Sequence, residues 1–157
     1  MSERDKLGSS GVFKAIVASA RKLKRAVTGG DDAITPEVEE IGNAVARAFI
    51  AGRFGDVYLM TSPLVQRRLE RGSFESQWRE AVRGRGTLTG FEVANVGQID
   101  IGFIPGLEET PQSEFVAFLE VAFSSPEVPL DHEKAFVVGV VILDQGQGLR
   151  IGALHTR

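Results

Sequence analysis

The sequence predicts an α+β fold in which helices come first and strands follow. Three observations lead to this prediction. Apolar residues recur every three or four positions before residue 84, β-branched residues alternate with polar ones after residue 88, and Gly84 and Gly86 separate the two patterns. Helices followed by antiparallel strands are the segregated order of an α+β protein. The 157 residues, of which 43% are hydrophobic, suffice for one sizeable core.

Residues 12–27 are expected to form a basic amphipathic helix. Their apolar residues recur in steps of three and four and form one narrow stripe, whereas the lysines and arginines lie beside or behind it. Such a helix docks on its own domain, on a second copy or on a protein partner, or it lies on an anionic membrane surface. The residues expected to make the contact are Phe13, Lys14, Ile16, Arg21, Lys22, Leu23, Lys24 and Arg25.

The stretch TGGDDAIT, 28–35, is expected to be a linker, because Gly and Asp favour turns over helix. It divides the chain into an N-terminal segment, 1–35, and a main domain, 36–157. The main domain begins with a helix that Thr35 caps, Pro36 opens and Gly52 ends.

Residues 53–86 predict three shorter helices. The first spans 53–60. Ser62 and Pro63 start the second, because serine caps a helix and proline fits its first position. Gly72 is expected to end this helix and Ser73 to cap the third.

Four strands are expected in the second half, at 87–104, 114–125, 134–144 and 149–156, with turn-rich loops between them. The third of these is apolar at nearly every position, so it is predicted to be a central strand that is covered on both faces. The turn DQGQG joins it to the last strand as a hairpin.

One long stretch, VARAFIAGRFGDVYLMTSPLVQRRL, resembles the nuclear transport factor 2-like superfamily, as do SFESQW and the closing strand LRIGALHT. The resemblance covers residues 37–157 and is closest to small bacterial domains of unknown function. It implies a cystatin-like, cone-shaped α+β roll, in which the helices pack on a strongly bent antiparallel sheet. Enzymes of the superfamily resemble ketosteroid isomerase, scytalone dehydratase or polyketide cyclases, but no motif here carries their catalytic roles over.

Four side chains are candidates for a pocket. Glu120 interrupts an apolar row that contains Val116, Phe118 and Ala122, so it is the candidate general base or acid. The alternative is that the row is partly exposed, or that Arg79 or Arg83 pairs with this carboxylate. The other three candidates are the single tyrosine, the single tryptophan and a histidine expected to share a face with Leu149, Ile151 and Ala153, namely Tyr58, Trp78 and His155.

Several functions are not predicted. The chain has no cysteine, and His132 lies between two acids without further ligands nearby, so we expect no metal site and no cofactor. The net charge of -3 comprises +5 in residues 1–30, -4 in 31–60, +3 in 61–90 and -7 thereafter. Nucleic-acid binding is not expected, because Phe13 is the one aromatic residue of the basic segment.

The expected location is cytoplasmic, with attachment to a membrane surface through residues 12–27 as an alternative. Lys14 interrupts the first apolar run, which is therefore neither a secretory signal nor a membrane span. The expected function is a non-catalytic binding or assembly module that forms a homodimer through its sheet face. The alternative is a small-molecule enzyme or ligand carrier of the isomerase, dehydratase or cyclase type, in which Glu120 is the pocket carboxylate.

Overall fold

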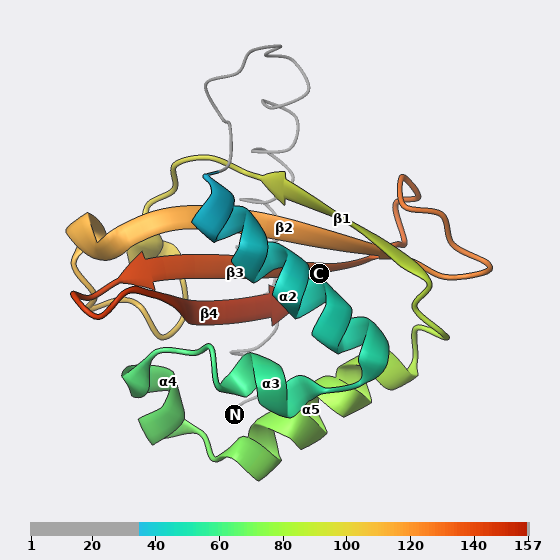
Figure 1. Ribbon diagram of the computed structural model, residues 1–157, viewed down its shortest axis with the longest axis horizontal. Helices are drawn as coiled ribbons and strands as arrows, with labels where there is room; N and C mark the ends of the chain where they lie inside the picture. The colour runs from blue at the N-terminus through green and yellow to red at the C-terminus, as the bar shows by residue number, and fades with distance from the viewer. Residues whose placement is uncertain (1–34, 157) are drawn as a thin grey trace.

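The computed structural model describes residues 35–156. Four α-helices open this part of the chain and a four-stranded antiparallel sheet closes it (Figure 1). The predicted α+β order is therefore confirmed. The helix expected at 12–27 lies outside the described residues. The described helices are α2 (Pro36–Ala51), α3 (Phe54–Tyr58), α4 (Pro63–Arg68) and α5 (Arg71–Arg83).

Helix α2 has the ends that the sequence predicts. The Thr35 hydroxyl accepts a hydrogen bond from the Val38 backbone N–H at 3.4 Å, and Pro36 occupies the first turn. Gly52 adopts the left-handed conformation with φ 74°, which glycine reaches without a steric penalty. Local capping residues therefore determine where this helix begins and ends.

The boundary between α4 and α5 differs from the prediction. Helix α4 ends at Arg68, and Glu70 occupies the N-cap position of α5 without a capping hydrogen bond from its side chain. Gly72 therefore does not end the preceding helix and Ser73 does not cap the next one, because both lie inside α5. The Tyr58 hydroxyl donates hydrogen bonds to the Leu69 carbonyl at 2.8 Å and to the Gln66 carbonyl at 3.1 Å. A contact from α3 thus stabilises the break between α4 and α5. The helix propensities of the residues near Gly72 give no sign of this contact.

The sheet is a meander in the order β1-β2-β3-β4, formed by β1 (Gly90–Asn95), β2 (Phe115–Ser124), β3 (Phe136–Asp144) and β4 (Leu149–Thr156). The first strand is shorter than the predicted 87–104. The Asn95 side chain accepts a hydrogen bond from the Gly97 N–H at 3.1 Å, and Gly97 has φ 110°, so the chain turns out of the sheet there. The residues that follow instead form a short 3-10 helix at Ile101–Phe103.

Strand β3 is buried along both faces, as predicted for a central strand: only Asp144, its last residue, is exposed. We call the side of the sheet that packs on the helices the helix face. It carries Leu119, Val121 and Phe123 of β2, with α2 lying across it (Figure 1). The opposite side, the far face, carries Phe118, Val141 and Leu143, which pack on a separate cluster from the segment 96–114: Ile101, Ile104 and Leu107.

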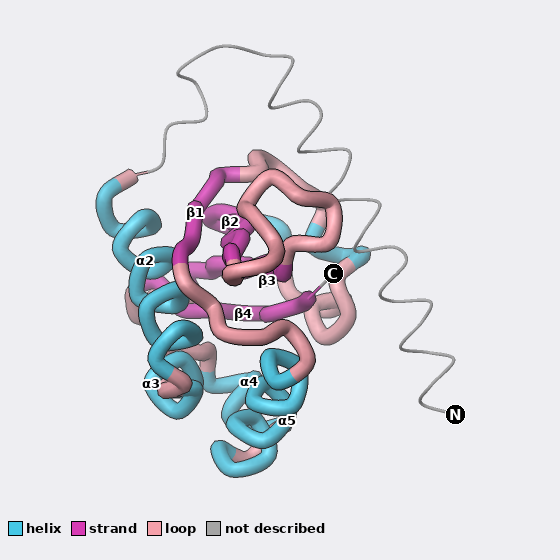
Figure 2. Tube along the Cα trace, turned by 90° about the vertical axis from the view of Figure 1, so that its right-hand side faces the viewer, coloured by secondary structure: helices cyan, strands magenta, loops and turns pink. Residues whose placement is uncertain are grey.

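The sheet is not strongly curled, which corrects the strongly bent sheet of a cone-shaped roll. Figure 2 shows the strands between the helices on one side and the loop segments on the other. Because side chains are packed against both faces, the sheet lies between two layers instead of wrapping around one.

Phe49 of α2 is the side chain on which the helix face depends most. It is 2% exposed and contacts four other aromatic rings. We expect Phe49→Ala to lower the free energy of unfolding by about 3–5 kcal/mol, since it removes a buried ring and leaves a cavity. Urea denaturation followed by circular dichroism measures this change. Ile50→Ala, at a neighbouring residue that is 38% exposed, is the control and should cost about 0.5 kcal/mol; equal losses would contradict the assignment.

Candidate functional site

Two of the four candidate pocket residues, Tyr58 and Trp78, belong to the core on the helix face. Tyr58 is 9% exposed, and its hydroxyl is occupied by the two backbone carbonyls between α4 and α5. Trp78 of α5 packs with its ring centroid 5.2 Å from that of Phe49. Both side chains therefore fill core volume.

Aromatic rings fill the space between the helices and the sheet. The Phe49 ring is stacked on Phe123 of β2 at 5.7 Å and lies edge-on to Phe54 at 5.1 Å. Phe123 is in turn stacked on Phe136 of β3 at 5.7 Å. Stacked and edge-to-face pairs of this kind add packing energy beyond the area that they bury. In this part of the described chain, these aromatic rings occupy the space between the helices and the sheet in which a substrate would have to lie.

The other two candidates, Glu120 and His155, lie on the far face and in one row. Glu120 pairs with Gly139 in the register of β2 and β3, and Gly139 pairs with His155 in that of β3 and β4. Gly139 has no side chain, so no third side chain stands between the acid and the histidine in this row. The sheet therefore separates Glu120 and His155 from Tyr58 and Trp78.

Glu120 is 5% exposed, so the acid is buried and not on a partly exposed row. Val116, which was expected in the same row, is 39% exposed and lies at the β-bulge between Phe115 and Ala117, so it leaves the row. The Glu120 oxygen Oε2 and the His155 nitrogen Nε2 are both buried, and each of the two residues takes part in at least one further interaction. The suggested arginine partners lie on α5 at the helix face. There the Arg79 guanidinium sits 5.8 Å from the Phe54 ring centroid, and Arg83 pairs with Glu80 at 2.9 Å.

His155 does not share a face with Leu149 and Ile151, which corrects the expected row. A β-bulge lies between Val141 and Ile142, and it shifts the pairing so that Ile151 faces the helices while Ala153 faces the far side. Gly152 is the residue at this irregularity. An added Cβ there would meet Leu143 Cγ at 2.8 Å, so the close approach requires glycine. A glycine inside a predicted strand was the one local sign of the bulge.

Burial lowers the pKa of His155 from its usual 6.5 to about 4, because the charged imidazolium loses hydration. The ring is therefore neutral at pH 7. A neutral imidazole can accept a proton, but this one has a weakened affinity for it and no open route to solvent at Nε2. The chemistry favours a structural histidine over a proton shuttle near pH 7.

Within residues 35–156, no three His, Cys, Asp or Glu side chains come together as a metal ion would need. His132 uses Nδ1 to accept the Lys134 N–H at 3.0 Å, so it shapes the loop before β3. No helix among the described residues is long and apolar enough to cross a membrane.

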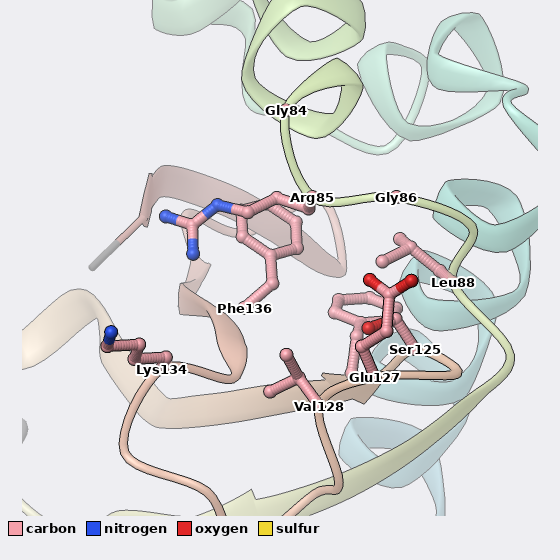
Figure 3. Close-up of a pocket in the computed structure, with 10 residues that line it drawn as sticks. Gly84, Arg85, Gly86, Leu88, Ser125, Glu127, Val128, Lys134 and Phe136 are labelled. Carbon is pink, nitrogen blue, oxygen red and sulfur yellow. The ribbon is translucent and has the colours of Figure 1, made fainter.

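A pocket that the sequence analysis did not indicate lies where the loop after α5 meets the loop between β2 and β3 (Figure 3). Its volume is about 220 Å³. Its base is apolar, with Leu88, Phe123 and Phe136, and its mouth carries Arg85, Lys134 and Glu127. The glycines and prolines of these loops were visible in the sequence, but nothing local showed that the two loops meet.

Comparison with known proteins gives no relative: no family model matches the chain, and no curated protein or solved structure matches it.

The burial of His155 predicts a loss of stability in acid. The unfolded chain binds a proton at pH values between 4 and 6.5 that the folded chain does not bind, so stability falls as the pH falls through this window. We expect the free energy of unfolding of the wild type, relative to His155→Gln, to decrease by about 3 kcal/mol between pH 7 and pH 4. Urea titrations at both pH values measure it. His132→Gln, in an exposed loop, is the control, and an equal pH dependence for both variants would refute the assignment.

Proposed function

We propose that this protein is a non-catalytic binding and assembly module that forms a homodimer through the far face of its sheet. The observation that carries the non-catalytic part is the separation of the candidate residues by the sheet. Glu120 and His155 lie on one side, and Tyr58 and Trp78 on the other. A catalytic site of the isomerase or cyclase kind needs acid, base and hydrogen-bond donor around one substrate. Here the described residues on the helix side are packed ring against ring.

The interface that we propose is the half of the far face around Gly139. The segment 96–114 packs on the other half, at Phe118, Val141 and Leu143. The half around Gly139 has small apolar side chains, Ala122 and Val137, which are 8% and 1% exposed. A sheet surface with few long side chains lets a helix approach closely, as a docking face requires.

The element that we propose for this face is the amphipathic helix predicted at 12–27, supplied by the second copy. Its apolar stripe packs on Ala122 and Val137 in this proposal. Its lysines and arginines then lie near the two acids on the far face, Glu92 and Glu120. In Figure 1, α2 begins beside β1, the edge strand of the sheet. The eight-residue linker at 28–35 reaches at most about 28 Å when extended, enough to cross to a neighbouring copy. A twofold pair makes this contact twice.

Membership of the nuclear transport factor 2-like superfamily, which the sequence resembles, is a further part of this proposal. The helices before an antiparallel sheet and the Ser62–Pro63 helix start support it. The moderate curl of the sheet sets this chain apart from the cone-shaped roll that the resemblance implies.

The oligomeric state tests the proposal. We expect the full chain to have twice its 17.0 kDa mass by light scattering across a dilution series. The double substitution Ile16→Glu with Leu23→Glu places charges in the apolar stripe and should give a monomer with an unchanged circular dichroism spectrum. The matched control, Ile50→Glu with Leu59→Glu, makes the same change at two exposed apolar residues of the helix layer, outside the proposed interface, and should remain a dimer. A wild type that is monomeric at every concentration would end the proposal.

A further inference from the structure

The two edges of the sheet differ in how the described residues cover them. At the β4 edge, the Ile151 N–H donates to the Met60 carbonyl at 2.9 Å, and the Ile151 carbonyl accepts the Ser62 N–H at 2.8 Å. The segment before α4 thus pairs with the middle of β4 as a further strand would. Strand β1 is the other edge and forms the upper border of the sheet in Figure 1. Within residues 35–156, no segment pairs with its outer side.

The hydrogen-bond register determines which backbone groups of β1 point away from the sheet. The Val96 N–H donates to the Phe118 carbonyl at 2.8 Å, and the β1–β2 register continues from this pair. In an antiparallel pair every second residue bonds to the neighbouring strand, and the residues between them point outward. Phe91 and Val93 are therefore the outward residues in the interior of β1. Each offers one N–H and one C=O in the plane of the sheet, and neither residue has a further hydrogen bond within the described chain.

The side chains of β1 set the residue pattern of a segment that pairs with this edge. Phe91 and Val93 are half-buried and pack on the helix-face core, whereas Glu92 between them is exposed and points to the far face. An added antiparallel strand places the residues opposite Phe91 and Val93 on the helix face, and the residue between those two beside Glu92. Apolar pairs and pairs of opposite charge stabilise neighbouring strands. The pattern that fits is therefore apolar, basic, apolar.

We propose that the β1 edge binds an extended segment of a protein partner, in which apolar residues alternate with lysine or arginine, as an added antiparallel strand. Residues 91–157 carry a net charge of -7, which attracts a basic segment. A second copy of β1 is a poorer occupant, because it brings another Glu92 to the same face and like charges on neighbouring strands repel. The hydrogen bonds of an edge run in the plane of the sheet, so this site is separate from the interface proposed on the far face.

An NMR titration of the 15N-labelled full chain tests the proposal, with a short peptide that alternates valine and lysine and is blocked at both ends. We expect the amide signals of Phe91 and Val93 to shift, with a dissociation constant of about 1 mM or lower. N-methylation of the valines removes the N–H groups that face β1 and should weaken binding at least about tenfold. N-methylation of the lysines alters the opposite edge of the peptide and is the matched control, which should bind as the parent does. Glutamate in place of lysine should also weaken binding about tenfold.

Two substitutions of Val93 test the same contact from the side of the protein. Val93→Pro removes the outward N–H, which an edge strand tolerates, and should weaken binding of the parent peptide about tenfold. Val93→Thr keeps the N–H and the branched shape and should bind as the wild type does. Should Val93→Pro unfold the protein, the two methylated peptides still decide. No shift of the β1 signals at about 10 mM peptide, equal affinity for both methylated peptides or for the glutamate peptide, or unchanged binding in folded Val93→Pro would each overturn the proposal.

Discussion

The burial of both faces of β3 is the constraint on which the other layers of this structure depend. Eight of its nine residues, Phe136 to Leu143, are buried. Each face therefore needs a cover of its own. Helix α2 with its aromatic side chains covers one face, and the segment 96–114 covers one half of the other with Ile101, Ile104 and Leu107. Burial of this apolar surface is the main favourable contribution to folding, and it also keeps the sheet from curling around a single layer.

The same constraint decides where chemistry can take place. A sheet covered on both sides separates the two layers, because side chains at consecutive positions of a strand point to opposite faces. Glu120 and His155 share the far face because Gly139 lies between them in register. Tyr58 and Trp78 are tied to the helices by hydrogen bonds and ring packing. The pocket lies at the edge of the core, where loops meet and Arg85, Lys134 and Glu127 can reach solvent.

Sequence reasoning succeeded where local chemistry decides the structure. Thr35 and Gly52 mark the ends of α2, and apolar runs mark β2, β3 and β4, because caps and burial act within a few residues. The burial of Glu120 followed from its place among apolar neighbours.

Sequence reasoning failed where distant residues decide the structure. The break between α4 and α5 depends on the Tyr58 hydroxyl, and the face of His155 depends on a bulge at Gly152. A bulge shifts every later side chain to the other face, so one irregular residue misplaces a whole row. The pocket depends on two loops that meet only in the folded chain, which no pattern along the sequence could indicate.

The central claim is that the far face around Gly139 is an interface between copies, occupied by the helix predicted at 12–27. The most direct measurement is an isotope-filtered NOE experiment on a mixture of 13C-labelled and unlabelled chains. Our account predicts intermolecular NOEs between the methyl groups of Leu23 and those of Val137. NOEs between these methyl groups that appear only within one chain, or none at all in a mixture shown to have exchanged subunits, would contradict it.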